Sequence, residues 1–253
     1  MGVIRTDEWL EQDFENVLSI CKRMKKSFED ADEKEIFQFL YKKGLYKPSK
    51  FSKIDYHKLK KIRVWEKIDR FFHKYKKKWN GPDIPIYIFP IRKSINMNFQ
   101  KTGISFKDKM ILFLSPLEDD KEYEALFVHE YHHASRMNQL IKPLDEYTLL
   151  DSIIMEGLAE HAVLEYCGSE YLAKWCEYYS NKMIKNFWDF YLSKNLNIKL
   201  DNPMHDVLLY GMKQFPTMVG YACGFYLINE FKKKNHFSTK TFLDSPPERF
   251  LID

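Results

Sequence analysis

Two histidines and a glutamate near the middle of the chain have a spacing that suits metal-dependent hydrolysis. Residues 128–133 contain His-Glu-x-x-His, with His129 and His133 four positions apart. On a helix these positions lie on one face, so both imidazoles can point at one metal ion. Glu130 lies roughly 100° further round the helix, where its carboxylate can reach a water at the metal without ligating the metal. These groups are the minimal set for a zinc hydrolase.

The surrounding residues favour a helix for this motif. Residues 121–140 contain neither Gly nor Pro, and Leu126, Val128 and Leu140 are apolar positions that suit a partly buried helix. A His-x-x-x-His pair can also be two hydrogen-bonded polar residues in a core. We favour the metal site because a second motif supplies what the pair lacks.

The second motif, Glu156-Gly-Leu-Ala-Glu160, offers the missing ligand. Catalytic zinc needs three protein ligands and one open position. The motif lies in an apolar segment from about Thr148 to Cys167, whose periodicity predicts another helix. Glu156 is the natural third ligand, and Glu160, one turn later, can accept the N–H of a ligand histidine. A solvated acidic stripe is the alternative, but the apolar neighbours predict that at least one glutamate faces the interior.

These motifs together resemble a known group of proteases. The two histidines and Glu130, followed by Glu156-x-x-x-Glu160, are similar to gluzincins, in which a downstream helix supplies a glutamate ligand and then an acidic residue. His-Glu-Tyr-His-His, Glu-Gly-Leu-Ala-Glu and the segment 216–224 more closely resemble the YjaZ-type predicted zinc-dependent proteases of bacteria. The resemblance covers roughly residues 85–231 and is not seen over the first 80. It implies a zincin-like fold, a Zn²⁺ ion, and a peptide or protein substrate.

Other zinc-protease classes and ligands can be weighed on the same residues. The extended metzincin motif requires Gly and then His after the second histidine. Arg136 and Gln139 occupy those positions, which excludes a metzincin. Asp145 and Asp151 stay open as third ligands, although neither is followed by a carboxylate four residues later.

Two further histidines lie close to the motifs in the sequence. His132 could pair with His129, but only the pairing of His129 with His133 leaves Glu130 in the expected place between ligands. We therefore expect His132 either to be exposed or to contact a metal ligand without binding the metal itself. His161 is a less favoured substitute ligand, and we expect it to be a surface or packing residue.

The implied chemistry is the hydrolysis of a peptide bond by an activated water. A bound zinc ion would acidify a water and polarise the substrate carbonyl. Glu130 would accept the proton of that water and deliver it to the departing amine. The developing oxyanion needs one further donor. Tyr221 is our first candidate because it lies in the segment that resembles the family, and Tyr210 and His205 are the alternatives.

A small sheet is expected before the motif helix. The β-branched and aromatic run 84–91 is bounded by Pro and predicts a strand. Residues 104–114 predict a second strand that ends at Ser115-Pro116. We expect residues 103–106 to form part of an edge that can hold an extended peptide by backbone hydrogen bonds. A plain hairpin that supports the helix is the alternative.

The fold class expected is α+β and mostly helical, with a small upper-lobe sheet, the motif helix and a helical lower lobe. We treat 1–253 as one catalytic unit with an N-terminal helical region (1–80), the sheet and motif helix (81–140) and a helical lobe with the third ligand (141–253). Amphipathic spacing predicts helices in 7–43 and 56–79, with a turn at 44–52. Further helices are expected at 169–194, 204–213 and 216–234, before a loop after Asn235.

Composition excludes several other classes. Forty basic against 36 acidic residues leave a net charge of +4, and no nucleic-acid fold motif is present, so we expect no nucleic-acid partner. The chain has no run of 18 apolar residues, so we expect no membrane span. The N-terminus lacks the apolar region of a signal peptide, and four cysteines without Cys-x-x-Cys spacing suit a reducing cytoplasm. The sequence does not determine the oligomeric state.

Two alternatives to a peptidase remain. A zinc hydrolase could act on a small non-peptide amide, which a closed pocket would favour over an open cleft. A non-catalytic zinc-binding regulatory protein is the other alternative, but such a protein has no need of a base like Glu130 beside its ligands. We therefore expect a zinc metallopeptidase of the gluzincin type.

Overall fold

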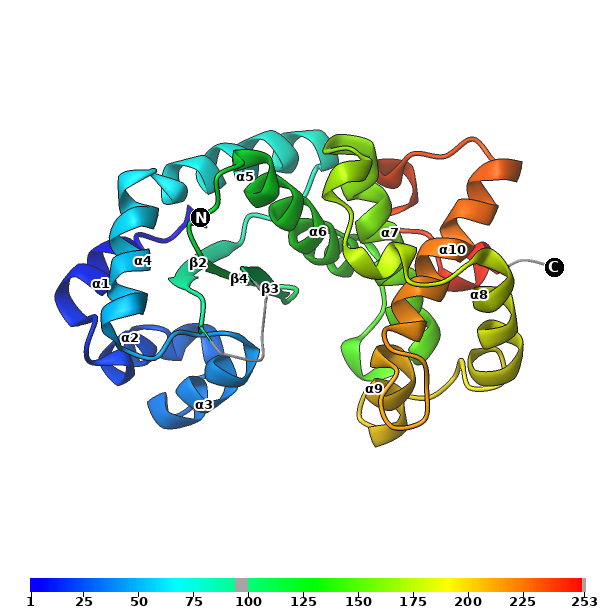
Figure 1. The fold of residues 1–253 in the computed structure, drawn as a ribbon, viewed down its shortest axis with the longest axis horizontal. Helices are drawn as coiled ribbons and strands as arrows, with labels where there is room; N and C mark the ends of the chain where they lie inside the picture. Colours follow the sequence, from blue (N-terminus) through cyan, green and yellow to red (C-terminus); the bar gives the residue numbers. More distant parts are fainter. Residues whose placement is uncertain (94–99, 252–253) are drawn as a thin grey trace. The chain divides into compact units, whose positions relative to one another are not determined.

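The computed structural model describes residues 1–93 and 100–251 and is mostly helical, with one small sheet (Figure 1). This confirms the expected α+β class, whereas the zincin-like assignment stays a prediction. The chain divides into two compact units, Met1–Ala134 and Ser135–Asp253, and the boundary falls inside helix α6, Asp120–Gln139. The single catalytic unit expected over 1–253 stays a prediction.

The sheet of the first unit has four strands in the order β1-β2-β4-β3. Their bounds are Gly2–Val3 (β1), Pro85–Pro90 (β2), Lys101–Ser105 (β3) and Met110–Leu114 (β4). Strand β2 runs parallel to β1 and β4, and β3 runs antiparallel to β4. All residues of β2 and β4 are buried, which explains their continuous apolar sequences. The strand predicted at 84–91 is confirmed as β2.

The single strand predicted over 104–114 is wrong. This segment contains a tight turn in which the backbone N–H of Phe106 donates to the carbonyl of Lys109 at 2.9 Å. The turn returns the chain alongside itself, so β3 and β4 form a hairpin with Gly103 opposite Leu112. Strand β3 lies at the edge of the sheet, as expected for 103–105, and Phe106 lies just beyond it. Strand β1 was not predicted, because two residues carry no periodicity.

The helices of the first unit are shorter than the predicted amphipathic stretches. They are α1 (Thr6–Asp13), α2 (Val17–Arg23), a 3₁₀ turn (Lys25–Phe28), α3 (Glu33–Lys43), α4 (Lys50–Lys61), α5 (Val64–Trp79) and the first part of α6. Side chains that accept backbone N–H groups start new helices at Asn16, Asp32 and Ser49. Arg63, at φ 57°, breaks the stretch predicted from 56 to 79 into α4 and α5.

Aromatic side chains of α5 fix the position of the motif helix. Trp79 stacks on Tyr131 of α6, with ring centroids 5.9 Å apart, and Tyr131 donates to the carbonyl of Pro82 at 2.8 Å. About two turns earlier on α6, the buried Glu124 carboxylate accepts from Lys74 at 2.6 Å and from Tyr75 at 2.7 Å. By the helical period, these contacts lie on the side of α6 roughly opposite the two motif histidines. The aromatic residues of α5 are therefore core residues that orient α6.

The second unit is helical throughout its regular structure. It contains α7 (Leu149–Tyr166), α8 (Asn181–Phe187), a π-helical turn (Trp188–Leu192), α9 (Pro203–Tyr210), α10 (Val219–Lys234) and 3₁₀ turns at 144–146, 169–171, 174–177, 239–242 and 247–250. The helix predicted at 148–167 is confirmed as α7. The helix predicted over 169–194 is wrong in its first half, because Ser180 caps a new helix only at Asn181.

The segment after α10 is anchored rather than a free loop. The guanidinium of Arg136 is buried, and it donates to the carbonyls of Phe242, Leu243 and Ser245 at 2.8–3.1 Å. Burial lowers the pKa of Arg136 to about 10. Arg136 occupies the position where a metzincin has glycine, and here its side chain ties the C-terminal segment to the end of α6.

Helices α7 and α10 meet through glycines. A β-carbon at Gly224 would lie 2.0 Å from the carbonyl oxygen of Ile153, and one at Gly157 would lie 2.4 Å from the backbone of Gly224. Both distances are far inside van der Waals contact, and backbone atoms have little room to move. Helices α7 and α10 are therefore in close contact, with Gly157 of the second motif as the partner of Gly224.

We predict that Gly224→Ala destabilises the protein by about 1–3 kcal/mol, since the added methyl group forces α7 and α10 apart. Chemical denaturation followed by circular dichroism measures the change. Lys234→Ala, at the exposed end of α10, is the control and should change stability little. An unchanged denaturation midpoint for Gly224→Ala would show that the two helices can separate freely.

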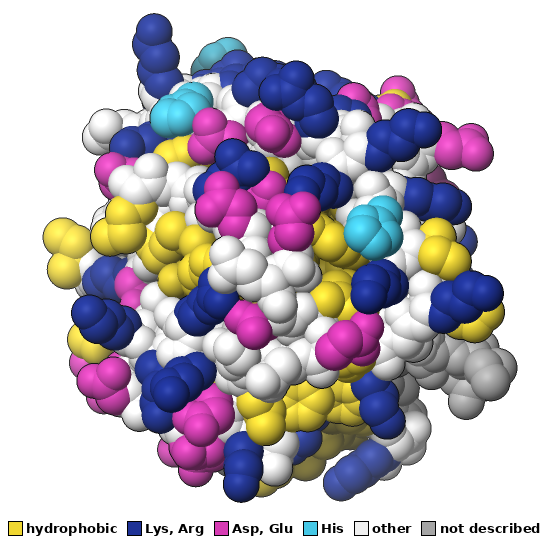
Figure 2. Space-filling model, turned by 90° about the vertical axis from the view of Figure 1, so that its left-hand side faces the viewer, with side chains coloured by type: hydrophobic (Ala, Val, Ile, Leu, Met, Phe, Trp, Pro, Cys, Tyr) yellow, Lys and Arg dark blue, Asp and Glu magenta, His cyan; other side chains and the backbone are white. Residues whose placement is uncertain are grey.

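Charged side chains of both signs are mixed over the surface. Figure 2 shows Lys and Arg interspersed with Asp and Glu on the face that it draws. In the basic run 74–78 of α5, Lys74 pairs with Glu124 at 2.6 Å and Lys76 with Asp83 at 3.1 Å. Two lysines of this run thus have acidic partners. Among the described residues, no helix combines the length and the apolar character needed to cross a membrane.

Candidate metal centre

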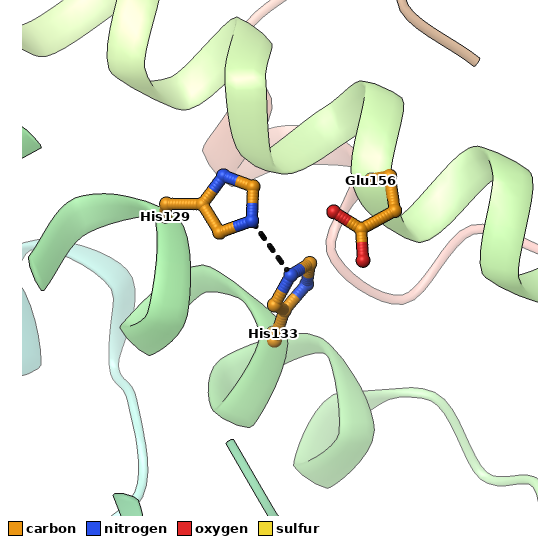
Figure 3. Close-up of side chains that lie close together, drawn as sticks. All are labelled: His129, His133 and Glu156. Atoms are coloured by element: carbon orange, nitrogen blue, oxygen red, sulfur yellow. Dashed lines mark hydrogen bonds between the residues drawn. The ribbon is translucent and has the colours of Figure 1, made fainter. Parts of the chain in front are cut away.

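The two motif histidines lie together on α6 of the first unit. Their Nε2 atoms are 3.0 Å apart, and their rings meet nearly at right angles, at 85° (Figure 3). His133 is buried and His129 partly exposed. Helix α6 starts where the Asp119 carboxylate accepts the N–H of Lys121 at 2.8 Å, and its uninterrupted course places the residues four apart on one face.

The separation of the two Nε2 atoms fits a shared zinc ion. Two nitrogens at 2.0–2.1 Å from a tetrahedral zinc would be about 3.3 Å apart. The observed 3.0 Å, at which the two rings can also share a hydrogen bond, is close to that value. Imidazole nitrogen is also a preferred zinc ligand. The pair therefore fits two positions of a zinc site.

The predicted third ligand, Glu156, lies on α7 of the second unit. This helix starts at a capping box in which Thr148 and Asp151 satisfy each other's backbone N–H groups. The Asp151 carboxylate also binds Lys142 at 2.6 Å, so this alternative ligand serves the helix start. Glu156 itself is partly buried, and its place in one metal site with His129 and His133 stays a prediction.

Glu160 lies one turn after Glu156 and is buried. Its Oε2 accepts the backbone N–H of Ala173 at 3.0 Å and lies 3.8 Å from the Sγ of Cys176. The carboxylate thus holds the start of the 3₁₀ turn at 174–177. Burial raises the pKa of Cys176, and the Glu160 carboxylate raises it further. Its predicted hydrogen bond to a ligand histidine stays a prediction.

Tyr221, the predicted oxyanion donor, lies in the first turn of α10 and is partly buried. Its hydroxyl hydrogen-bonds to Glu156 and to Tyr210, whose ring centroid is 5.6 Å away. Burial and the neighbouring Glu156 carboxylate raise the pKa of Tyr221 well above its usual value, so the phenol stays protonated and able to donate. The structure therefore places Tyr221 beside the predicted third ligand.

We predict that Tyr221→Phe lowers turnover about 10- to 100-fold while zinc remains bound, since the variant loses a donor but no ligand. Peptide cleavage at increasing free zinc measures the effect. A loss that excess zinc restores would assign Tyr221 to holding Glu156 instead of stabilising an oxyanion. Undiminished turnover would move the oxyanion role to Tyr210 or His205.

The alternative donors have other partners in the second unit. His205 is buried, and its two ring nitrogens lie 2.9 Å from Ser152 Oγ and 2.9 Å from Asp206 Oδ1. These contacts join α9 to α7 and hold the imidazole in place. Tyr210 is about one-third exposed and contacts Tyr221.

His132 and His161 are both buried. An exposed position, which was one of the two expectations for each of them, is therefore wrong. His132 is fully buried against Trp79 of α5, with ring centroids 5.5 Å apart, because it lies on the aromatic side of α6. His161 is fully buried and stacks on Phe225 at 4.5 Å. His161 is therefore a packing residue, as the other half of its prediction states.

The environment of His161 keeps its ring neutral. Lys232 Nζ lies 3.4 Å from Nδ1 and can only donate, so Nδ1 accepts, and Nε2 carries the hydrogen that points to the Phe225 carbonyl, 3.2 Å away. Burial and the positive charge of Lys232 lower the pKa of His161 from 6.5 to about 3.

This lowered pKa predicts a loss of stability in mild acid. As the pH falls below 6.5, His161 becomes protonated in the unfolded chain, whereas in the folded chain it stays neutral until about pH 3. The free energy of unfolding therefore falls between these two pH values. Thermal unfolding between pH 7 and pH 4 should show a steeper decline for the wild type than for His161→Phe, which cannot titrate. Equal slopes would contradict the assignment.

Glu130, the predicted base, is buried and held by strand β3 within the first unit. The Oγ of Ser105 lies 2.6 Å from the Glu130 carboxylate and 2.8 Å from its backbone carbonyl. Gly103 lies directly against the same side chain. The role of Ser105 was missed because a serine in a strand carries no sequence signal for a partner 25 residues away.

The family model described as Predicted Zn-dependent protease (DUF2268) matches residues 64–252 of this chain. The chain belongs to this family. It is also 34% identical over 257 aligned residues to the Uncharacterized protein YjaZ of Bacillus subtilis (strain 168), over 99% of this chain and 98% of that protein. No solved structure matches the chain.

Membership of the DUF2268 family confirms the resemblance seen in the motifs and extends it. Similarity to YjaZ covers the first 80 residues as well, where the short motifs showed none. The helices and β1 of this region have no distinctive motif, so only comparison along the whole chain relates them. The family's description associates these proteins with zinc and proteolysis as a prediction.

Proposed function

We propose that this protein is a zinc-dependent metallopeptidase of the gluzincin type. The observation that carries the proposal is the approach of His129 and His133, whose Nε2 atoms are 3.0 Å apart. Glu156 is the third ligand that we propose. The family description supports the same metal and the same class of reaction. In this proposal, zinc supplies an acidic water and polarises the peptide carbonyl when it is bound.

The chain's own residues have separate tasks in this proposal. Glu130 takes the proton of the attacking water and gives it to the leaving amine. Tyr221, kept protonated by its surroundings, donates to the developing oxyanion, and Glu160 orients a ligand histidine. These roles are proposals that rest on the spacing of the residues and on the contacts described above.

A peptide is the substrate that we propose. Strand β3 lies at the sheet edge, with β4 on one side, and Glu130 packs against its residues Gly103 and Ser105. An edge strand can pair with an extended chain by backbone hydrogen bonds, which suits a peptide better than a small amide.

No disulfide joins the four cysteines, which all lie in described segments, and this supports the cytoplasmic location that we propose.

Metal analysis and peptide cleavage test the proposal together. The protein is purified without added metal and its zinc content is measured by elemental mass spectrometry. It is then incubated with a mixed peptide library before and after chelation. We expect about one zinc per chain, cleavage that is lost on chelation, and recovery when zinc is added back. A folded protein without zinc would contradict the proposal, and bound zinc without cleavage would favour a regulatory protein.

A further inference from the structure

The side chain of Glu130 rests on one face of strand β3. Ser105 Oγ lies 2.6 Å from Glu130 Oε2, a distance typical of a charge-assisted hydrogen bond in which the hydroxyl donates to a carboxylate. At Gly103, an added β-carbon would lie 2.5 Å from Cγ, 2.6 Å from Cδ and 2.7 Å from Oε1 of the same glutamate. Both β3 residues therefore contact this one side chain, and both lie within the first unit.

Their spacing explains why they act together. Side chains two apart in a strand point to the same face, so positions 103 and 105 both face Glu130. The backbone of Gly103 is not in the left-handed region, so glycine is needed here for space and not for its conformation. Glycine leaves room for the carboxylate to lie across the strand, and serine supplies the donor.

We propose that Gly103 and Ser105 form a seat that orients the carboxylate of Glu130 for its role as the base. This inference rests on the proposed function and adds two positioning residues to it. A buried glutamate has several rotamers, and only some direct its carboxylate to the reacting water. Misplacement of such a group by about 1 Å can cost about 100-fold in rate. The seat restricts Glu130 to one position before substrate arrives.

The Ser105 hydroxyl also contacts the backbone of Glu130. Its Oγ lies 2.6 Å from the carboxylate and 2.8 Å from the carbonyl oxygen of the same residue. One serine therefore contacts both ends of the glutamate, which limits rotation of the side chain about its bonds.

Steady-state kinetics of zinc-loaded variants test the seat. We expect Ser105→Ala to lower kcat about 10-fold and Gly103→Ala about 100-fold, with KM and zinc content within about twofold of the wild type. Ser105→Thr keeps a hydroxyl in a strand position and should recover most of the activity. The control is Ser115→Ala, which removes a serine hydroxyl that donates to a backbone carbonyl of the same hairpin, that of Gln100, at 2.7 Å.

The outcomes separate positioning from simple structural support. If Ser105→Ala retains the kcat of the Ser115→Ala control, or if Ser105→Thr is no better than Ser105→Ala, the seat is overturned. Loss of zinc from Ser105→Ala would also overturn it, because the seat holds the base and not the ligands.

Crystal structures of the wild type and Gly103→Ala, both with zinc, give a readout that does not depend on activity. The carboxylate of Glu130 should contact Gly103 and Ser105 in the wild type and be displaced in the variant. The same carboxylate position in both would overturn the seat. A wild type that binds zinc but cleaves no peptide would contradict the proposed function alone, because the crystal structures still decide whether β3 holds Glu130.

Discussion

Glu130→Gln is expected to lower kcat/KM for peptide cleavage about 10²- to 10⁴-fold while leaving about one zinc per chain. Glutamine has nearly the same shape as glutamate, but its amide cannot take the proton of the attacking water. The ligands His129 and His133 are untouched, so the metal should stay. Zinc analysis and peptide cleavage, measured on the same preparation, check both halves of this expectation.

A second glutamate on α6 offers a matched control. Glu122 is partly exposed and pairs with Lys101 at 2.7 Å, about two turns before His129 on the helix. Glu122→Gln makes the same chemical change on the same helix and should keep both zinc and activity. If Glu130→Gln were as active as this control, Glu130 would not be the base, and the water would need another proton acceptor.

His133→Ala is expected to weaken zinc binding about 10²- to 10³-fold, since it removes one of the three protein ligands. His129→Ala and Glu156→Ala should have similar effects. Glu160→Ala should weaken binding less, about 10-fold, because it removes an orienting carboxylate and no ligand. Competition with a chromogenic zinc chelator measures these affinities.

The order of these four affinities tests the ligand set. His73→Ala, a change to an exposed histidine of α5, serves as the control and should leave zinc affinity unchanged. Full zinc affinity in Glu156→Ala would remove Glu156 from the set and leave a two-histidine site. A larger loss in Glu160→Ala than in Glu156→Ala would instead exchange the roles of the two glutamates.

The sequence by itself determined the local elements that carry the chemistry. Residues 120–139 and 149–166 form uninterrupted helices because they lack proline, follow the helical period and start at acidic or hydroxyl caps. On such a helix the spacing of His129 and His133 alone places both imidazoles on one face. The buried strand β2 was likewise evident from its continuous apolar sequence.

Other features depended on contacts between residues far apart in the sequence, and only the tertiary structure decided them. The hairpin of β3 and β4 is an exception, because its turn lies at three consecutive charged residues, 107–109, which are visible in the sequence. The burial of His132 and His161 depends on Trp79 and Phe225, which belong to other helices. Glu130 is supported by a glycine and a serine of β3. The sequence did not predict this support, because a hydrogen bond or a close contact between distant residues leaves no local pattern.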